Sequence, residues 1–390
     1  VLVNVEINSD LVSFTAIKII RHITRVMSTS SNKTIPQNCG RAVLPQWVND
    51  WPDPSIRMGQ VSGVAIDNSG QVLVFHRSHN LWDATTFNNR DVYQGIGEDP
   101  IPEPTILVLN DTGELVDSWG QKLFYIPHGI TVDYEGNVWV TDVALHQVFK
   151  FTPYDRLKPN LTLGEKFIPG NDDKHFCKPS AVAVLSNGDF FVADGYCNHR
   201  ILKFSPDGNI ILQWGLSHGN SPFSFNVPHA LTLAEDRGLV CVADRERGRV
   251  ACFRHDNGTY EGSFSSWLMG GRLFSVAYAP VHGGRLYVVN GPDSPLPNPV
   301  PVRGFVIDFS TGRLIQTFAP EEGLQNPHDI VTSADGSKVT ENYYYCDPRC
   351  SSQSLKHCAS CATKSEGQAK AIGCIFMKFS QNFGFYSYFV

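Results

Sequence analysis

The sequence has few of the features that place a chain in a membrane or on nucleic acid. Its most apolar N-terminal stretch, Leu11 to Ile20, contains Lys18 and is shorter than the ~20 residues that span a bilayer. It is also a poor signal peptide, and the chain begins with Val1 rather than Met. Basic blocks are missing, and 32 Lys and Arg against 38 Asp and Glu give a net charge of −6. We therefore expect no transmembrane segment and no nucleic-acid partner.

Helical periodicity is missing as well, while a β-type repeat fills the middle of the 390 residues. Each unit has an alternating apolar strand, a Gly-bearing turn and a second strand, as in IPHGITVDYEGNVWVTD (126–142) and KPSAVAVLSNGDFFVAD (178–194). Such alternation around a tight turn is typical of a β-hairpin. Further units start near residues 60, 227, 273 and 326, and most continue into a second hairpin.

Six units of four strands at a period of about 50 residues predict an all-β fold, a six-bladed β-propeller with four-stranded antiparallel blades. The propeller is expected over residues 46–339. Residues 1–45 are interpreted as a leader or linker, with an N-terminus that we expect to be incomplete. After Val339 the expected second strand of the last unit is absent from the sequence pattern. The last blade is therefore expected to be atypical, and residues 340–390 to form a divergent Cys-rich tail.

Three histidines share one position of the repeat. His128, His229 and His328 each follow a proline and are separated by 101 and 99 residues, which places them on blades 2, 4 and 6. The same position is assigned to serine in the other three blades: Ser62, Ser180 and Ser275. Alternate blades of six are related by a pseudo-threefold rotation, so the three imidazoles are expected to converge on the propeller axis. This arrangement predicts a three-histidine metal site, with zinc as the preferred ion.

The end of the second strand in each unit returns to the same face of the propeller. Asp142, Asp194 and Asp244 share this position, and we interpret them as acceptors that hold turn backbone. Blade 1 has His76 at this position instead. The residues that emerge next to this position differ in chemistry: Arg77 in blade 1, Tyr196 in blade 3 and Arg245 in blade 4. Guanidinium groups near a metal favour a carboxylate-bearing ligand. A tyrosine there can act as a general base if nearby cations lower its pKa from the usual ~10.

Cysteines and glycosylation sequons indicate an oxidising compartment. Cys241 and Cys252 are equidistant from a hairpin turn, and Cys177 and Cys197 bracket the first hairpin of blade 3, so each pair can close a disulfide. Asn-x-Ser/Thr sequons stand at Asn32, Asn110, Asn160 and Asn257. We expect a secreted glycoprotein or one held in the lumen of secretory granules, and a monomer by default.

Several long stretches carry a specific resemblance. The segments VFHRSHNLWD, LFYIPHGITVD, DGYCNHRI and CVADRERGRVACF, in this order, resemble those of the peptidyl-α-hydroxyglycine α-amidating lyases. The resemblance runs from about Trp47 to about Val339. It implies an NHL-type propeller and a lyase that converts a peptide ending in α-hydroxyglycine to a peptide amide and glyoxylate.

The resemblance also implies roles for individual residues. It assigns the zinc to His128, His229 and His328. It makes Tyr196 the base, Arg77 the residue that engages the hydroxyglycine end and supports Tyr196, and Arg245 a further cationic contact. A structural calcium ion is implied at Asp329 and the main-chain carbonyls of Val64 and Ile130. The implied disulfides are Cys177–Cys197 and Cys241–Cys252.

Two departures from the family pattern affect these expectations. No monooxygenase domain precedes the propeller, so we expect a lyase standing alone that receives its substrate from a separate peptidylglycine monooxygenase. The tail contains Cys346, Cys350, Cys358 and Cys361, whose loose spacing permits a zinc knuckle or disulfide-paired cysteines.

Two other functions compete with the lyase. A non-catalytic propeller that binds a protein on this face needs no converging imidazoles. A calcium-dependent propeller hydrolase is expected to carry Asn, Asp and Glu where this chain has histidine.

Overall fold

The computed structural model describes residues 46–48, 51–215, 219–293, 299–321, 323–324, 326–333, 335–343 and 374–378. These residues form six four-stranded sheets in which every strand pairing is antiparallel, and the predicted six-bladed β-propeller is confirmed. All described strands belong to one compact unit that begins at Leu44. Among the described residues, no helix has the length and apolar character needed to cross a membrane.

Five blades consist of four consecutive strands each. Blade 1 contains β2 (Val61–Ile66), β3 (Val72–His76), β4 (Ile106–Leu109) and β5 (Leu115–Trp119). Blade 2 contains β6 (Pro127–Val132), β7 (Val138–Asp142), β8 (Gln147–Phe151) and β9 (Leu161–Leu163). Blade 3 contains β10 (Pro179–Val184), β11 (Phe190–Asp194), β12 (Arg200–Phe204) and β13 (Ile210–Trp214). Blade 4 contains β14 (Pro228–Ala234), β15 (Leu239–Asp244), β16 (Arg249–Arg254) and β17 (Tyr260–Phe264). Blade 5 contains β18 (Leu273–Ala279), β19 (Arg285–Asn290), β20 (Gly304–Asp308) and β21 (Leu314–Phe318).

Short 3-10 helices occupy three connections: η1 (Glu235–Arg237), η2 (Arg245–Arg247) and η3 (Trp267–Met269). The hairpin turns use the residues that the sequence pattern indicated. In the β2–β3 turn, Gly70 adopts φ 84°, a left-handed conformation that glycine tolerates best, and the Asp67 carboxylate accepts the amide protons of Ser69 and Gln71. Apolar side chains pack between neighbouring blades. Trp139 of blade 2 and Phe190 of blade 3 are both fully buried, with ring centroids 4.4 Å apart.

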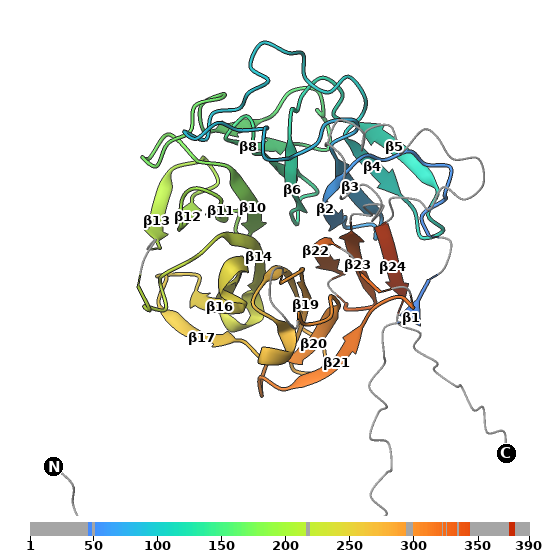
Figure 1. Cartoon of the computed structure of the whole chain (residues 1–390), viewed down its shortest axis with the longest axis vertical. Helices are drawn as coiled ribbons and strands as arrows, with labels where there is room; N and C mark the ends of the chain where they lie inside the picture. Colours follow the sequence, from blue (N-terminus) through green and yellow to red (C-terminus); the bar gives the residue numbers. More distant parts are fainter. Residues whose placement is uncertain are drawn as a thin grey trace, which may run out of the picture. The chain divides into compact units, whose positions relative to one another are not determined.

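The innermost strands of the blades surround the propeller axis (Figure 1). Each contacts its neighbours in chain order, from β2 through β6, β10, β14 and β18 to β22, and β22 returns to contact β2. The ring is therefore closed, and the residues that begin the inner strands face a common centre.

The last blade closes the ring differently from the expectation. It contains β22 (Pro327–Thr332), β23 (Lys338–Tyr343), β24 (Cys374–Lys378) and, as the outermost strand, β1 (Gln46–Trp47). The prediction that the second strand is absent after Val339 is wrong, as is the placement of the propeller's end at residue 339. The third strand, with the sequence CIFMK, pairs with β23 although thirty residues separate them, 344–373, which lie outside the described residues. Two strands pair when their backbone donors and acceptors are in register, so a long connection between β23 and β24 does not prevent their pairing.

Each inner strand contains a β-bulge near its start. One residue is skipped in the pairing with the second strand in five blades, and in blade 2 both His128 and Gly129 are skipped. Such a bulge turns a side chain out of the regular alternation. The skipped residues include His229 and His328, and also Ser62 and Ser180 of blades 1 and 3. In blade 5 the skipped residue is Phe274 rather than Ser275, because Leu273 pairs with Asn290 and Ser275 with Val289. The assignment of Ser275 to the histidine position is therefore wrong by one residue.

Candidate active site

The three predicted histidines come together at the start of the inner strands of blades 2, 4 and 6. His128, His229 and His328 are all buried, and their ring centroids lie 4.7 to 5.0 Å apart. One ring nitrogen from each lies within 4.8 Å of the other two. The sequence spacing thus predicted a real spatial cluster.

Each of these imidazoles is oriented by a carbonyl group of the following blade. The Nδ1 atoms of His128, His229 and His328 lie 2.8, 2.6 and 2.7 Å from the carbonyl oxygens of Ser180, Phe274 and Ser62. A carbonyl oxygen only accepts hydrogen bonds, so each neutral ring carries its proton on Nδ1 and keeps a lone pair on Nε2. The residues whose carbonyl groups accept these hydrogen bonds are the bulge residues of blades 3, 5 and 1. The bulges therefore position both the imidazoles and the carbonyl groups that orient them.

The histidines are held in the neutral form that a metal requires. Burial lowers the pKa of His128 and of His229 well below the usual value, and the other histidines and the nearby arginines reinforce the effect. Burial and the charge of Arg77 lower the pKa of His328 to about 3. Protons therefore compete weakly for these nitrogens at neutral pH.

Tyr196 extends into the histidine cluster. Its hydroxyl oxygen lies 2.8 Å from Nε2 of His128 and 2.8 Å from Nε2 of His229, and Nη1 of Arg245 donates to it at 3.3 Å. Burial raises the pKa of Tyr196, while the charges of Arg245 and Arg77 act in the opposite direction. The phenol ring lies against Trp82, with ring centroids 4.6 Å apart.

Arg77 approaches the site from blade 1. Its side chain is 3% exposed, Nε donates to the carbonyl oxygen of Pro127 at 2.9 Å, and Nη1 donates to Oε1 of Gln60 at 2.8 Å. Its guanidinium carbon lies 5.3 Å from the centre of the Trp82 ring. Within the described part of the chain, the buried Nη2 atom has no hydrogen-bond partner. A buried cationic donor without an acceptor is suited to an anionic ligand.

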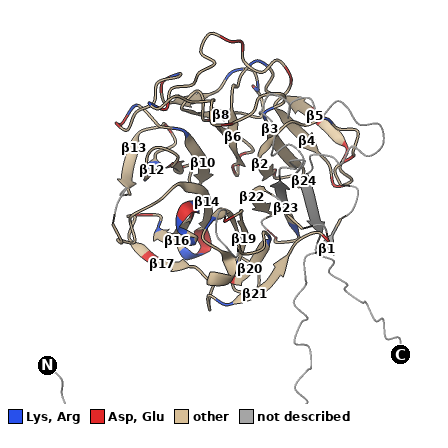
Figure 2. Ribbon diagram, in the orientation of Figure 1, with Lys and Arg blue, Asp and Glu red and all other residues tan. Residues whose placement is uncertain are grey.

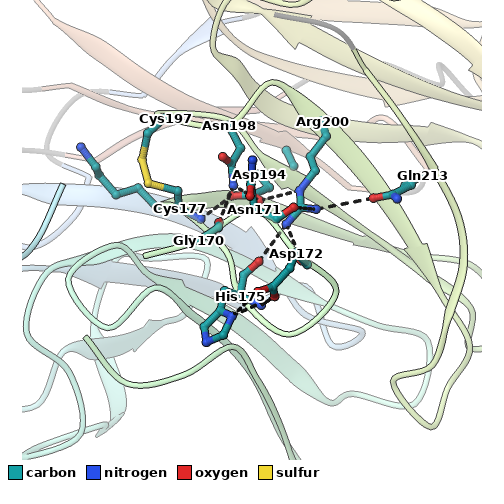
Figure 3. Close-up of polar contacts among 12 residues, drawn as sticks. Gly170, Asn171, Asp172, His175, Cys177, Asp194, Cys197, Asn198, Arg200 and Gln213 are labelled. Atoms are coloured by element: carbon teal, nitrogen blue, oxygen red, sulfur yellow. Dashed lines mark hydrogen bonds and ion pairs between the residues drawn. A yellow bond between two sulfur atoms is a disulfide. The ribbon is translucent and has the colours of Figure 1, made fainter. Parts of the chain in front are cut away.

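The loop that carries Tyr196 is held on both sides (Figure 3). The carboxylate of Asp194 accepts the amide proton of Cys177 at 2.8 Å and a proton from Nε of Arg200 at 2.9 Å. The predicted disulfide Cys177–Cys197 is present and directly follows Tyr196. Arg200 also donates to the carbonyl oxygens of Asn171, Asp172 and His175. The network fixes the position of the phenol.

The other predicted residues of this face lie as follows. The carboxylates of Asp142 and Asp244 accept backbone amide protons of the loops before β6 and β14, in agreement with a structural interpretation. The predicted disulfide Cys241–Cys252 joins β15 and β16. Of the sequons, Asn160 and Asn257 are exposed, and the side chain of Asn110 is hydrogen-bonded to Glu114 and Thr112. Asn32 and the cysteines of the tail from Cys346 to Cys361 lie outside the described residues.

A cavity of about 660 Å³ follows the axis and is lined by the three histidines and by the residues of the predicted calcium site, Val64, Ile130 and Asp329. The Asp329 carboxylate accepts protons from the Val64 amide at 3.0 Å and the Ser275 hydroxyl at 2.7 Å. Burial raises the pKa of Asp329 to about 6. Carboxylate oxygens and main-chain carbonyl oxygens are ligands that calcium prefers.

The donor set at the centre fits a zinc ion. The Tyr196 hydroxyl carries one proton, yet it faces two Nε2 atoms that are both acceptors, so one of them is left without a donor by this contact. The Nε2 lone pairs of three buried neutral imidazoles cannot donate hydrogen bonds to one another, but together they can coordinate a cation. The orienting carbonyl groups on Nδ1 are also the second-layer partners that metal-bound histidines have.

Sequence reasoning missed three residues of this site. Trp82, Gln60 and Phe274 contact Tyr196, Arg77 and His229, respectively. Trp82 stands in the stretch VFHRSHNLWD, but it belongs to a long β3–β4 connection whose path the repeat does not predict. Phe274 was missed through the one-residue error in blade 5.

Comparison with known proteins places the fold and the site in a class. The NHL repeat family matches residues 124–151, 176–204 and 225–253. A chain in the crystal structure of a nidogen/laminin complex shares the fold, with a TM-score of 0.50 and 16% identity over 70% of this chain and 84% of that chain. The protein is thus an NHL-repeat β-propeller with a buried three-histidine centre. Its sequence is 49% identical to peptidyl-alpha-hydroxyglycine alpha-amidating lyase 1 of Drosophila melanogaster over 305 residues, which are 75% of this chain and 56% of that protein.

Lyase 2 of the same organism is 41% identical over 316 residues, covering 79% of this chain and 74% of that protein. The chain belongs to the peptidyl-α-hydroxyglycine α-amidating lyase family, as the resemblance implied. It is also 46% identical to peptidyl-glycine alpha-amidating monooxygenase B of Xenopus laevis over 74% of its own length. It spans 56% of the first fly lyase and 33% of the Xenopus protein.

Proposed function

We propose that this protein is a zinc-dependent lyase that cleaves peptides ending in α-hydroxyglycine into a peptide amide and glyoxylate. The observation that supports this most is the contact of the Tyr196 hydroxyl with Nε2 of His128 and of His229, both at 2.8 Å. This contact supports a role for the phenol as an acid–base group beside the three imidazoles that we propose to hold the metal. The buried free donor of Arg77 adds a place for the carboxylate of the substrate.

The reaction needs one proton removed and one bond broken. The α-carbon of the substrate bears a hydroxyl, an amide nitrogen and a carboxylate. Tyr196, as phenolate, takes the hydroxyl proton, and the C–O bond becomes the aldehyde C=O. The electron pair of the breaking C–N bond goes to the nitrogen, which takes up one proton, so that the net reaction moves one proton from the hydroxyl oxygen to the nitrogen and Tyr196 returns to its starting form. Arg77 and Arg245 bind the anionic end and keep the hydroxyl beside Tyr196. No oxidant or reductant is consumed.

His128, His229 and His328 would hold the zinc ion, which would supply Lewis acidity and a positive charge that favours the ionised form of Tyr196. The charges of Arg245 and Arg77 act on Tyr196 in the same direction. These contributions oppose burial, which on its own keeps the phenol protonated.

The remaining features of the proposal concern metal, compartment and partner. We assign calcium to Asp329 with the carbonyl groups of Val64 and Ile130, as a structural ion in the axial cavity. The two disulfides and the exposed sequons at Asn160 and Asn257 support a secreted protein or one stored in the granule lumen. Because a peptidyl-α-hydroxyglycine is formed by hydroxylation of a C-terminal glycine, the reaction that supplies the substrate is that of a peptidylglycine monooxygenase.

The deciding experiment is to incubate the purified protein with a peptidyl-α-hydroxyglycine and measure glyoxylate. The assay is run as prepared, after removal of metal with a chelator, and after zinc is added back. We expect glyoxylate release that the chelator abolishes and zinc restores. A folded, zinc-loaded protein that releases no glyoxylate contradicts the proposal and favours a non-catalytic binding propeller. Ester hydrolysis dependent on calcium would favour a hydrolase instead.

A further inference from the structure

A second layer of charged side chains lies behind Arg245, at the junction of blades 4 and 5. Glu246 follows Arg245 in η2, and Arg272 comes directly before β18. Figure 2 shows cationic and anionic segments next to one another beside β14 and β16. Neither Glu246 nor Arg272 has a part in the reaction as described above, yet both are connected to it through Arg245.

Glu246 bridges the two arginines. Its Oε1 atom accepts a proton from Nε of Arg245 at 2.8 Å. Its two carboxylate oxygens also accept protons from Arg272, from Nε at 2.9 Å and from Nη2 at 2.7 Å. This two-point contact fixes the plane of the carboxylate. With Nε of Arg245 occupied in this way, Nη1 of the same guanidinium points at the Tyr196 hydroxyl.

Phe274 provides the floor for both guanidinium groups. The guanidinium carbons of Arg245 and Arg272 lie 5.0 and 5.2 Å from the centre of the Phe274 ring, within cation–π distance. The same ring contacts His229 at 5.7 Å, and the Phe274 carbonyl oxygen orients Nδ1 of that histidine. The aromatic residue thus links the arginine pair to one metal ligand.

The electrostatics of the junction favour an ionised Glu246. Burial raises the pKa of this carboxyl, but the hydrogen bonds from Arg272 and the charge of Arg245 outweigh it, and the pKa lies below its usual value. The side chains of Arg245, Glu246 and Arg272 are 15%, 26% and 31% exposed. The last contact of Arg272, from Nη1 to the Pro292 carbonyl oxygen at 3.1 Å, anchors the pair to the loop after β19.

We propose that Glu246 and Arg272 are positioning residues of the active site: their ion pair, built on the ring of Phe274, holds the guanidinium of Arg245 against the hydroxyl of Tyr196. The inference deepens the proposed lyase function and rests on it for its kinetic consequence. The geometric part, that Glu246 restrains Arg245, can be tested without any catalytic readout.

The kinetic experiment uses Glu246→Gln, which keeps the size of the side chain and removes its charge. We expect kcat to fall about 10- to 100-fold and KM to rise by a smaller factor, because a displaced Arg245 loses its contact with the Tyr196 hydroxyl and part of its contact with the anionic end of the substrate. Combined with Arg245→Gln, the double variant should be no slower than Arg245→Gln alone, since Glu246 acts through that residue. Arg272→Met should reproduce the loss, and Glu246→Asp should restore part of it. The zinc content and melting temperature of Glu246→Gln should stay near those of the wild type.

A matched control breaks a similar ion pair elsewhere. Arg285 and Asp308 form a partly buried pair between β19 and β20, at 19% and 23% exposure, away from the histidines. Asp308→Asn should leave kcat unchanged. If the role of Glu246 is purely structural, Glu246→Gln should leave kcat unchanged, as Asp308→Asn does.

The second readout is labelling of arginine with phenylglyoxal, followed by mass spectrometry. Arg245 should react severalfold faster in Glu246→Gln than in the wild type, while the labelling rate of Arg285 stays unchanged. In Asp308→Asn, Arg285 should react faster and the labelling rate of Arg245 should stay unchanged. Unchanged Arg245 labelling, or additive kinetic losses in the double variant, overturns the inference. If the wild type releases no glyoxylate, the proposed function fails, and the labelling result alone decides whether Glu246 restrains Arg245.

Discussion

The Nδ1 atom of His328 lies 2.7 Å from the carbonyl oxygen of Ser62, although 266 residues separate the two in the chain. His328 stands in the last blade and Ser62 in the first, so this contact crosses the seam at which the ring closes. The third imidazole therefore receives its orientation only when β22 is packed against β2. Ring closure and assembly of the histidine cluster are one structural event.

This relationship predicts that removal of the closing strand costs zinc. A variant that ends after Tyr343 loses β24, and with it the five residue pairs that β24 forms with β23. At about 1 kcal/mol for each backbone hydrogen bond, we expect a loss of a few kcal/mol in the free energy of unfolding and less than one bound zinc ion per chain. Metal analysis and thermal unfolding measure both. A variant that ends after Lys378 serves as the control, and a Tyr343 truncation with full zinc and unchanged stability would show that closure is dispensable.

Tyr196→Phe removes a hydroxyl that contacts two of the three clustered imidazoles. We expect kcat for glyoxylate release to fall about 10²- to 10⁴-fold, the range typical of a lost general acid or base. Zinc content should be retained, because the three imidazoles do not depend on the phenol for their orientation. Tyr134→Phe changes an exposed tyrosine outside the histidine cluster and is the matched control. Equal activity of the two variants would exclude Tyr196 as the base.

The two disulfides should differ in their effect on catalysis. Cys177–Cys197 and Cys241–Cys252 close loops with sequence separations of 20 and 11, and each should contribute about 3 kcal/mol to stability. Only the first is adjacent to Tyr196. Replacement of each pair by alanine should therefore lower stability similarly, whereas kcat should fall roughly tenfold only for the Cys177–Cys197 variant. Thermal unfolding and the glyoxylate assay on both variants check this. A similar loss of kcat in both would mean that the disulfide does not position the phenol.

The sequence predicted the repeated parts of this molecule well and the unrepeated parts poorly. The propeller, the histidine cluster and both disulfides follow from local strand patterns and from rotation about one axis, which fixes where equivalent residues meet. The errors arose where the chain departs from the repeat. The bulge that places Phe274 beside His229 depends on a one-residue register shift that alternation alone does not reveal. The third strand of the last blade follows an insertion, so its apolar residues stood too far from Val339 to be recognised as part of the same sheet.

The sequence pattern did not predict the roles of Trp82 and Arg272, for a related reason. Their roles come from contacts between connections of different blades, and the geometry of a connection is not set by the periodicity of the strands. Trp82 contacts Tyr196 from blade 1, and Arg272 reaches Glu246 across the junction of blades 4 and 5. Only the folded arrangement shows that these side chains support the two predicted catalytic residues.

The axial cavity predicts a calcium effect that depends on pH. Burial raises the pKa of Asp329 to about 6, above the ~3.9 of an exposed aspartate. Without calcium, ionised Asp329 is therefore disfavoured in the fold, and its contribution to stability decreases as the pH rises from about 4 through 6. Calcium binds the carboxylate and must displace a proton below pH 6, so its affinity should decrease about tenfold for each pH unit well below that value.

The stabilisation by calcium should consequently be larger at about pH 7.5 than at about pH 5 when the melting temperature is measured at one calcium concentration. Asp329→Asn should abolish both the stabilisation and its pH dependence. Asp335→Asn, which changes another carboxylate that lines the same cavity, should preserve both. The opposite order, with more stabilisation at the lower pH, would place the calcium at a group other than Asp329.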